Sequence, residues 1–372
     1  MKKILSIVTS FMLVVMLTFT STSVFAQENG RLSESEDKTC GLFVISNQVD
    51  NSLLQYAYIE KQNVSFALED VLQDELDRQC TISYGTAFNL NEIAYIPVLI
   101  NNEIVALLAI TETDGEYGWT LSKDFSNGLN SIASFTSAEV PAVLYTSSGN
   151  VYADISGNIT QLTFNPEIEE DIDSNLIQNL SGKLGVVVNL YSISEQDIAV
   201  DSEMLESRAA TSKTLDLDLA ETQSDQSWCS AFAGAQILRY IGKGSIYAED
   251  IMKYFYPKES ANALKEKSIS NSQLIEYANE KGSKPTRVSK TLSLDSVKKQ
   301  IDSGKPVYLG CEGRDTYKKA RHALVLRGYD TKNSTYSVWN PWNAQYVSMS
   351  TSSKSISVSG GKFVWDVTIY QW

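Results

Sequence analysis

The chain has 372 residues, of which 43% are hydrophobic and 20% charged, and its formal net charge is −14. This composition is that of a globular protein, and the length favours more than one domain. A single histidine excludes histidine-rich metal sites, and four cysteines are too few for a disulfide scaffold.

The N-terminus has the pattern of an export signal. Met1, Lys2 and Lys3 precede an apolar run from Ile4 to about Thr20, and Val24-Phe25-Ala26 follows as a small-x-small cleavage pattern. We predict a secretory signal peptide over residues 1–26, with a retained membrane anchor as the alternative. No later stretch is apolar enough to span a bilayer, so the mature chain is expected to be secreted, extracellular and without a membrane anchor.

Charge divides the remaining chain into two parts. Residues 27–208 carry 7 basic and 29 acidic side chains, a net of −22, whereas residues 209–372 carry 22 and 16, a net of +6. Such a split can indicate a nucleic-acid binder or two parts that attract each other. The basic part has no lysine/arginine block with interleaved aromatics, so no nucleic-acid partner is expected.

The acidic part is predicted to be mostly β-structure. Residues 93–100 and 104–110 form a hairpin pattern around Asn101-Asn102. Three further strands, separated by Ser-Gly-Asn turns, and one later strand are expected at residues 140–145, 151–155, 159–162 and 184–191. A helix is predicted over residues 64–76, and nothing in this part has a catalytic pattern.

The acidic part contains two cysteines whose pairing is open, and it ends in a predicted linker. Cys40 and Cys80 could pair with each other, which the sequence cannot decide. From about Glu195 to Leu219 the chain is rich in Asp, Glu, Ser, Thr and Ala, which predicts an exposed linker open to proteolysis.

The basic part is predicted to place helices before strands. An alanine-rich, non-alternating stretch begins at Cys229 and ends before Gly242 and Gly244, which is typical of a buried helix. Two amphipathic helices are expected at residues 248–256 and 272–281, and strands from Val307 onward. This order indicates an α+β domain of about 160 residues. Cys311 is expected to be a buried strand residue.

Cys229 is the candidate nucleophile. The reactive species is the thiolate, which the N-terminus of a helix and a nearby imidazolium both stabilise. Most cysteines without a disulfide are simply small buried residues, and Cys229 alone would be read that way. Gln223 and Trp228 beside it, and the single histidine His322 downstream, favour the nucleophile.

His322 is expected on one arm of a hairpin, with its orienting partner on the other arm. If the turn is centred near Thr331–Lys332, position 322 faces position 341, give or take one residue. Asn340 then lies within reach of the imidazole and can fix its tautomer. Asp330 would lie at the turn tip, roughly 26 Å away along the strand.

Gln223 is the candidate oxyanion donor. It lies six residues before Cys229, so its amide could act beside the backbone N–H of Cys229 at the helix start. Gln226, three residues before Cys229, is the weaker candidate.

These residues together resemble the papain-like cysteine peptidases, and more narrowly the secreted bacterial staphopains. The likeness includes Glu221-Thr222-Gln223, Trp228-Cys229, Ala248-Glu249 with Met252 and Pro257, His322-Ala323 and Trp339-Asn340-Pro341-Trp342. It covers about Leu219 to Trp372. The resemblance implies a papain-like fold, a nucleophile at Cys229, a base at His322, an orienting residue at Asn340 and an oxyanion donor at Gln223. It also implies a half-barrel-like inhibitory pro-segment. One departure is Arg321, which precedes the histidine where a glycine is common.

The sequence therefore predicts a signal peptide (1–26), an acidic β-rich propeptide with linker (27–208) and a papain-like domain (209–372). The expected function is a secreted cysteine endopeptidase made as a zymogen, with a thioester intermediate and without cofactor or metal. Candidate partners are protein or peptide substrates, the chain's own propeptide as inhibitor, and a dedicated protein inhibitor. The alternatives are an acyltransferase or cell-wall peptide hydrolase with the same residues, or an inactive papain-like binding module.

Overall fold

The computed structural model describes residues 41–72, 82–147, 150–163, 185–192, 211–314, 317, 320–342 and 345–372. Cys40–Trp372 form one compact unit. The predicted signal peptide, both members of the possible Cys40–Cys80 pair and the first part of the predicted linker lie outside the described residues.

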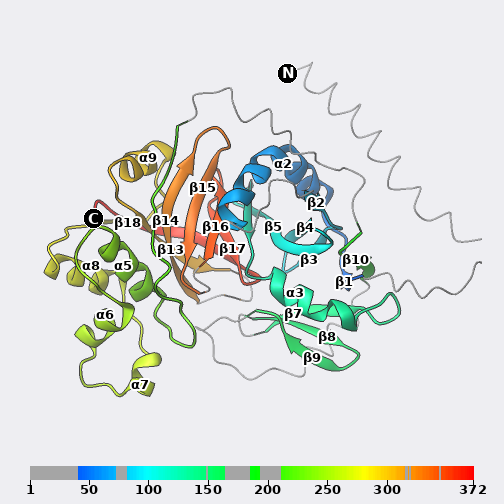
Figure 1. The fold of residues 1–372 in the computed structure, drawn as a ribbon, viewed down its shortest axis with the longest axis horizontal. Coiled ribbons are helices and arrows are strands. Elements are labelled where there is room, and N and C mark those ends of the chain that lie inside the picture. Colours follow the sequence, from blue (N-terminus) through cyan, green and yellow to red (C-terminus); the bar gives the residue numbers. More distant parts are fainter. Residues whose placement is uncertain are drawn as a thin grey trace, which may run out of the picture. The chain divides into compact units, whose positions relative to one another are not determined.

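In the residues that the structure describes, the acidic part contributes strands to two sheets and contains the helices α2 and α3 (Figure 1). One sheet has the strand order β10-β1-β7-β8-β9, in which β1 and β7 are parallel and the other neighbours antiparallel. The other contains β2 to β6, with β4, β5 and β6 in antiparallel succession and both β2 and β3 paired to β4. The elements are β1 (Phe43–Ser46), α2 (Asn51–Leu72), β2 (Ile82–Tyr84), β3 (Phe88–Leu90), β4 (Ile93–Ile100), β5 (Glu103–Thr113), β6 (Glu116–Ser122), α3 (Ser126–Ile132), the 3₁₀ turn η2 (Ala133–Phe135), β7 (Ala142–Ser147), β8 (Asn150–Ile155), β9 (Asn158–Gln161) and β10 (Val186–Asn189).

The predicted strands of this part are confirmed. The hairpin around Asn101-Asn102 is β4–β5, and both turn residues have positive φ, of 52° and 62°, as a two-residue hairpin turn requires. The three strands divided by Ser-Gly-Asn turns are β7, β8 and β9. Apolar residues of the two sheets and α3 pack into one core, including Phe88, Tyr95 and Phe125.

The predicted start of the helix at Val64 is wrong. Helix α2 begins at Asn51, after Asp50, whose side chain accepts a hydrogen bond from the backbone N–H of Ser52 at 2.8 Å. Only Leu53 and Ala57 are buried in its first two turns, whereas Tyr58 and Ile59 are exposed, so the apolar residues of this stretch do not follow the helical period. The last predicted residues, 73–76, lie outside the described part.

The basic part has helices first and strands second, as predicted. Its elements are β11 (Ser212–Thr214), α5 (Cys229–Tyr240), α6 (Ala248–Phe255), α7 (Ala261–Lys265), α8 (Asn271–Glu280), β12 (Thr286–Val288), α9 (Leu294–Asp302), β13 (Val307–Gly313), β14 (Arg321–Asp330), β15 (Thr335–Asn340), β16 (Gln345–Ser350), β17 (Ser355–Val358) and β18 (Gly361–Tyr370). The strands form an antiparallel sheet in the order β12-β18-β13-β14-β15-β16. This mixed helix-and-sheet architecture is compatible with a papain-like domain.

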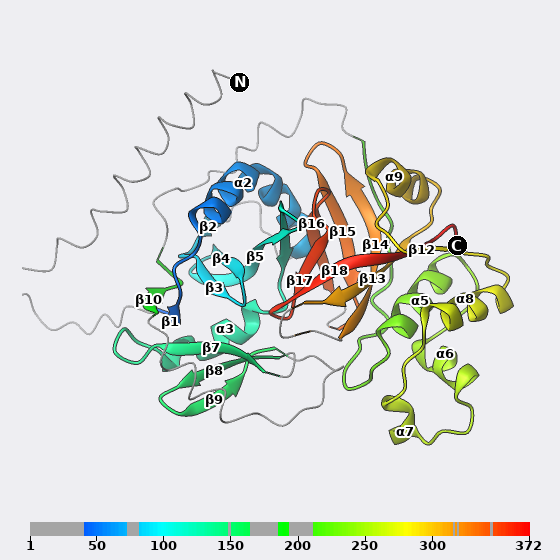
Figure 2. The ribbon, with the colours of Figure 1, turned by 180° about the vertical axis from the view of Figure 1, so that it is seen from behind.

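Helix α5 is the central helix of the basic part. It packs against β14, β13, α6 and α8, and Figure 2 shows it beside β13 and β14 from behind. Its residues from Ala231 to Leu238 are all buried. Gly234 allows the close approach of α8, because a Cβ there would lie 2.2 Å from Leu274 Cδ1. The helix ends before Gly242, which has a φ of 77°.

The two parts share one continuous sheet. Strand β6 of the acidic part pairs antiparallel with β16, with Leu121 opposite Ser348 and Thr120 opposite Met349. Helix α2 packs on β15 and β16 beside this junction. The edge of the basic part's sheet is thus completed by a strand from the acidic part.

Most of residues 211–219, the described end of the predicted linker, are exposed as predicted, but the segment pairs with the sheet and buries two leucines. Strand β11 pairs antiparallel with β14, with Lys213 opposite Tyr329, and Leu215 and Leu217 are buried. Their apolar side chains anchor the segment in the core, and the unpaired edge of β14 supplies backbone partners.

Candidate active site

Cys229 is the first residue of helix α5, as predicted. The backbone N–H groups of the first helical turn have no partner within the helix, and the helix dipole places partial positive charge there. The Cys229 thiol lies against β14, where its Sγ is 3.8 Å from the carbonyl oxygen of Arg321. The next residue along that strand is His322, so the helix start and the strand bring the thiol and the imidazole to one place.

His322 and Asn340 contact each other directly. His322 Nε2 lies 2.9 Å from Asn340 Oδ1, and both residues are almost completely buried. The pairing of Val325 with Trp339 sets the register of the two strands next to the site. The turn is centred one residue later than predicted, since Asp330 pairs with Thr335, and a bulge between Leu326 and Gly328 brings the register back within the predicted range.

The neighbouring hydrogen bonds fix which ring nitrogen carries the proton. The backbone N–H of Trp342 donates to Asn340 Oδ1 at 3.2 Å, which identifies that atom as the acceptor oxygen. Nε2 of His322 is therefore the donor. Burial, opposed by the hydrogen bond to Asn340, lowers the pKa of His322 to about 3. The ring is thus neutral at physiological pH, and Nδ1 is a buried acceptor with no hydrogen-bond partner.

Aromatic side chains hold the imidazole in place. The indole of Trp342 stacks on His322 with ring centroids 3.7 Å apart, and Phe363 packs against both rings with centroids at 5.6 Å. Trp342 belongs to the Trp339-Asn340-Pro341-Trp342 motif that the sequence singled out. Phe363 was not predicted, and alternation along β18 was the only signal of its burial.

Gln223 is tied to the same strand end. Its backbone N–H donates to the carbonyl of Pro341 at 2.8 Å, which places it beside Asn340 and Trp342. The side chain is buried, and Nε2 donates to the backbone oxygen of Gln226 at 2.5 Å. An amide nitrogen has two hydrogens, so this bond leaves one for another acceptor. Gln226 contributes its backbone to this arrangement and its Oε1 accepts from the N–H of Ser224.

Several buried polar atoms near the imidazole have no hydrogen-bond partner in the structure. They include Gln223 Oε1, His322 Nδ1, Asn340 Nδ2 and Trp342 Nε1. Such atoms are rare in folded proteins and need an explanation in each case. A group of them around one imidazole is typical of sites that bind or react.

The two residues that the sequence analysis excluded from the catalytic site, Asp330 and Cys311, lie elsewhere in the structure. Asp330 ends β14, where its carboxylate accepts from the backbone N–H groups of Lys332 and Asn333 at 2.8 and 3.1 Å. Cys311 lies inside β13 and is fully buried, and this burial raises the pKa of its thiol far above the usual range. It is therefore a core residue, as predicted. No disulfide joins Cys229 and Cys311.

Two further searches concern metals and membranes. Within the described ranges, no group of three or more His, Cys, Asp or Glu side chains could hold a metal ion. No helix in the part of the chain that the structure describes is long and apolar enough to cross a membrane.

Comparison with known proteins matches the same part of the chain. The family model of the staphopain peptidases (Staphopain peptidase C47) matches residues 209–372. Staphopain A of Staphylococcus aureus (strain MSSA476) is 22% identical over 160 residues, so the match spans 41% of this chain and 41% of that relative. Staphopain B of the same strain is 21% identical over 357 residues, 90% of this chain and 89% of the relative.

The family match begins at residue 209, before β11, and includes Cys229, His322, Asn340 and Gln223. The helix-first arrangement, the thiol at the start of α5 and the imidazole on β14 all lie within it. Residues 209–372 of this chain therefore carry a domain that matches the family model of the staphopain peptidases.

Proposed function

We propose that the chain is the precursor of a secreted, papain-like cysteine endopeptidase that hydrolyses peptide bonds in proteins. Cys229 is the nucleophile, His322 the base, Asn340 the orienting residue and Gln223 the oxyanion donor. The observation that carries this assignment is the bond from His322 Nε2 to Asn340 Oδ1, because it leaves Nδ1 as an acceptor next to the strand residue that Cys229 Sγ contacts.

The proposed reaction follows from these positions. His322 Nδ1 takes the thiol proton as Cys229 Sγ attacks the peptide carbonyl. The oxyanion accepts from the Cys229 backbone N–H and the second hydrogen of Gln223 Nε2. The C–N bond then breaks, and the imidazolium gives its proton to the leaving amine. Water, deprotonated by the neutral imidazole, hydrolyses the thioester and restores the thiol.

A pair of inhibitors tests this chemistry. A thiol alkylator should abolish hydrolysis of a protein substrate by the processed enzyme, with one modified residue mapped by mass spectrometry to Cys229. A chelator should leave the rate unchanged, because no step uses a metal. Loss of activity with a chelator, restored by added zinc, would refute the thiol mechanism. If the alkylator modified Cys229 but the untreated protein hydrolysed no substrate, the result would instead support a binding module.

We also infer that residues 27–208, after loss of the signal peptide, are a half-barrel-like pro-segment that keeps the peptidase latent. The support is a large contact surface on the basic part. Six serines of the basic part lie where it contacts the acidic part, and each is at most 6% exposed: Ser348, Ser350, Ser353, Ser355, Ser357 and Ser359.

The serine contacts are mostly hydrogen bonds to side chains of the acidic part. Ser355 Oγ lies 3.0 Å from Thr111 Oγ1, Ser357 Oγ lies 3.1 Å from Tyr95 OH, and Ser359 Oγ donates to Asp124 at 3.2 Å. Each such bond contributes only about 1 kcal/mol, because water can replace it. A surface of this kind can separate without exposing a large apolar face, which suits a segment that is removed by processing.

Arg327 supplies the main charged contact. Its guanidinium is buried, donates to Asp70 of α2, donates to the carbonyl of Leu215 at 3.2 Å and lies 3.4 Å above the ring of Tyr346. A buried cation that loses its anion is strongly destabilised. Asp70 is therefore a principal anchor of the acidic part on the basic part.

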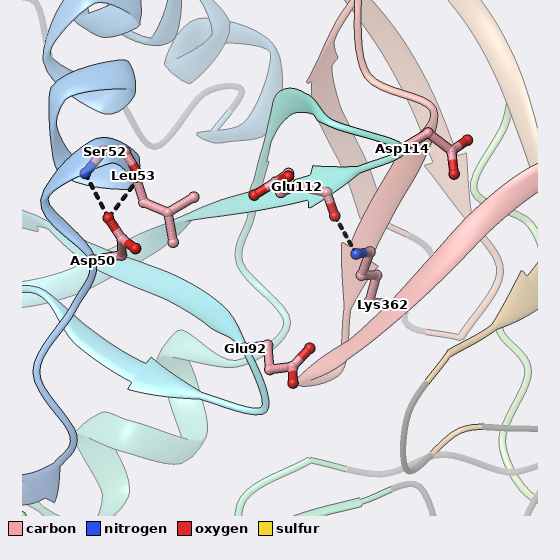
Figure 3. Close-up of a pocket in the computed structure, with 7 residues that line it drawn as sticks. All are labelled: Asp50, Ser52, Leu53, Glu92, Glu112, Asp114 and Lys362. Atoms are coloured by element: carbon pink, nitrogen blue, oxygen red, sulfur yellow. Dashed lines mark hydrogen bonds between the residues drawn. The ribbon is translucent and has the colours of Figure 1, made fainter.

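A second charged contact lies around Lys362 of β18. A cavity of about 280 Å³ is lined by Asp50, Ser52, Leu53, Glu92, Glu112, Asp114 and Lys362 (Figure 3). Lys362 Nζ donates to the backbone oxygen of Glu112. One lysine of the basic part thus shares this cavity with four acidic residues of the acidic part.

The contact surface is also connected to the imidazole. Tyr317 OH donates to the carbonyl of Ser359 at 2.8 Å, the residue whose N–H and hydroxyl donate to Asp124. The Tyr317 ring packs on Phe363 at 5.4 Å, and Phe363 packs on His322. A continuous chain of contacts thus joins the acidic part to the packing around His322, which supports the proposed latency.

Because the two parts carry opposite charge, salt should weaken their association. Charges farther apart than about 8 Å are largely screened at physiological ionic strength. We expect added salt to raise the inhibition constant of the separated pro-segment for the processed enzyme, mainly by lowering the association rate. The measurement is inhibition kinetics at low and high salt. If neither quantity responds, packing alone holds the complex.

The variant Asp70→Asn separates the Arg327 contact from the general charge effect. It should raise the inhibition constant about tenfold or more, chiefly through faster dissociation. Glu139→Gln, which removes an exposed carboxylate that bonds to Ser137 of its own segment, is the matched control and should change little. Equal effects of the two variants would contradict a specific role for Asp70.

A further inference from the structure

We propose that Arg321 selects substrates with an acidic side chain on the residue that follows the scissile bond. This inference rests on the proposed peptidase function and names a substrate preference for the same site. It concerns the residue at which the sequence departs from the glycine common in its family.

Arg321 lies at the edge of the reacting groups. It is the first residue of β14, its carbonyl oxygen is 3.8 Å from Cys229 Sγ, and it directly precedes His322. Consecutive strand residues point to opposite faces, so its side chain does not enter the His322–Asn340 contact. The side chain is 48% exposed and can therefore meet a ligand from solvent.

The chemistry decides which half of the substrate passes Arg321. His322 must protonate the leaving amine, so the part of the substrate that follows the scissile bond lies on the histidine side of the thiol. Arg321 is the neighbour of His322 on the strand and borders that side. The first side chain of the leaving half is thus within reach of a long, cationic residue.

A β-bulge holds the guanidinium in position. On β18, Trp365 pairs with Cys311 and Val367 with Gly310, which leaves Asp366 as the extra residue between them. Bulges commonly redirect a side chain next to a site. Asp366 Oδ1 accepts a hydrogen bond from Arg321 Nη2 at 2.6 Å, which limits the rotamers of the arginine.

The tethered arginine keeps donors for a second carboxylate. A guanidinium has five N–H donors, and one bond to Asp366 does not saturate it. Burial opposes the charged form, but the hydrogen bond and charge of Asp366 raise the pKa of Arg321, so the side chain stays cationic. Glu312, opposite Arg321 on β13, is itself paired with Arg314 at 3.0 Å.

The test compares three peptides that differ only in having Glu, Gln or Lys directly after the scissile bond. The enzyme is the peptidase obtained by processing the full chain, and kcat/KM is measured for each peptide at low and high salt. We expect Glu to exceed Lys by about three- to fivefold, the range of an exposed ion pair, with the ratio falling as salt is added.

Variants assign the preference to one side chain. Arg321→Gln should bring the Glu-to-Lys ratio close to one, and Arg321→Glu should invert it. Asp366→Asn should raise the ratio, because it removes the carboxylate that competes for the guanidinium. Arg314→Gln removes a positive charge nearby, with 47% of that side chain exposed, and also leaves Glu312 without its ion-pair partner, so it should lower the ratio less than Arg321→Gln does.

The outcomes separate this inference from the proposed function. Absence of hydrolysis of all three peptides would refute the peptidase itself. Hydrolysis of all three at equal rates, or a ratio that Arg321→Gln does not change, would overturn only the role of Arg321. An equal change in Arg314→Gln would assign the preference to the general field of the surface.

Discussion

Replacing Cys229 by alanine is expected to lower peptide hydrolysis by about 10⁴-fold or more, since no other group can form the thioester. The fold should persist, because the change removes a single sulfur atom at the start of α5. The measurement is kcat/KM on a protein substrate, together with the thermal unfolding midpoint and a circular dichroism spectrum.

Cys311→Ala is the matched control for this experiment. Cys311 is equally small and fully buried, and its pKa is raised by burial in β13, so it cannot supply a thiolate at physiological pH. That variant should retain most activity with a modest loss of stability. An inactive Cys311 variant beside an active Cys229 variant would show that the nucleophile is assigned to the wrong cysteine.

Substitutions at His322 and Asn340 should lower peptidase activity by different amounts. His322→Ala removes the group that carries the proton in both steps and should lower kcat/KM by about 10⁴-fold or more. Asn340→Ala removes only the acceptor that fixes the tautomer, while Trp342 and Phe363 still pack on the ring. We therefore expect a smaller loss, mainly in kcat.

Asp330→Ala provides the comparison for the hairpin. Asp330 stabilises the turn at the far end of β14 through Lys332 and Asn333, so its loss should affect stability rather than turnover. A large loss of activity at Asp330 with none at Asn340 would mean that the acidic residue orients the imidazole. Pre-steady-state measurement of acyl-enzyme formation would locate the defect in each variant.

The sequence predicted the site because its parts have local signals. Cys229 begins a continuous apolar, alanine-rich helix, which places it at the helix start without knowledge of the fold. A chain with one histidine leaves a single candidate for the imidazole. The period-two pattern on both sides of the turn at residues 331–334 predicts the register of the strands that carry His322 and Asn340 to within one residue.

Other features had no local signal, because they depend on partners far apart in the chain. Nothing near Arg327 indicates Asp70 of α2, which is 257 residues away. The serines of β16 and β17 look like those of a solvated surface strand until β5, β6 and α2 cover them. The same holds for the segment that follows β11: Leu215 and Leu217 become buried only because an edge of β14 is open to β11.

The sequence by itself thus determined which residues are proposed for the site, since residue type and periodicity act over a few neighbouring positions. The tertiary structure alone decided what surrounds that chemistry. It stacked Trp342 and Phe363 on the imidazole, joined β6 to β16 and aimed Asp366 at Arg321 through a bulge. These contacts join elements distant in sequence, and their free energy is gained only when the chain has folded and water has left the space between them.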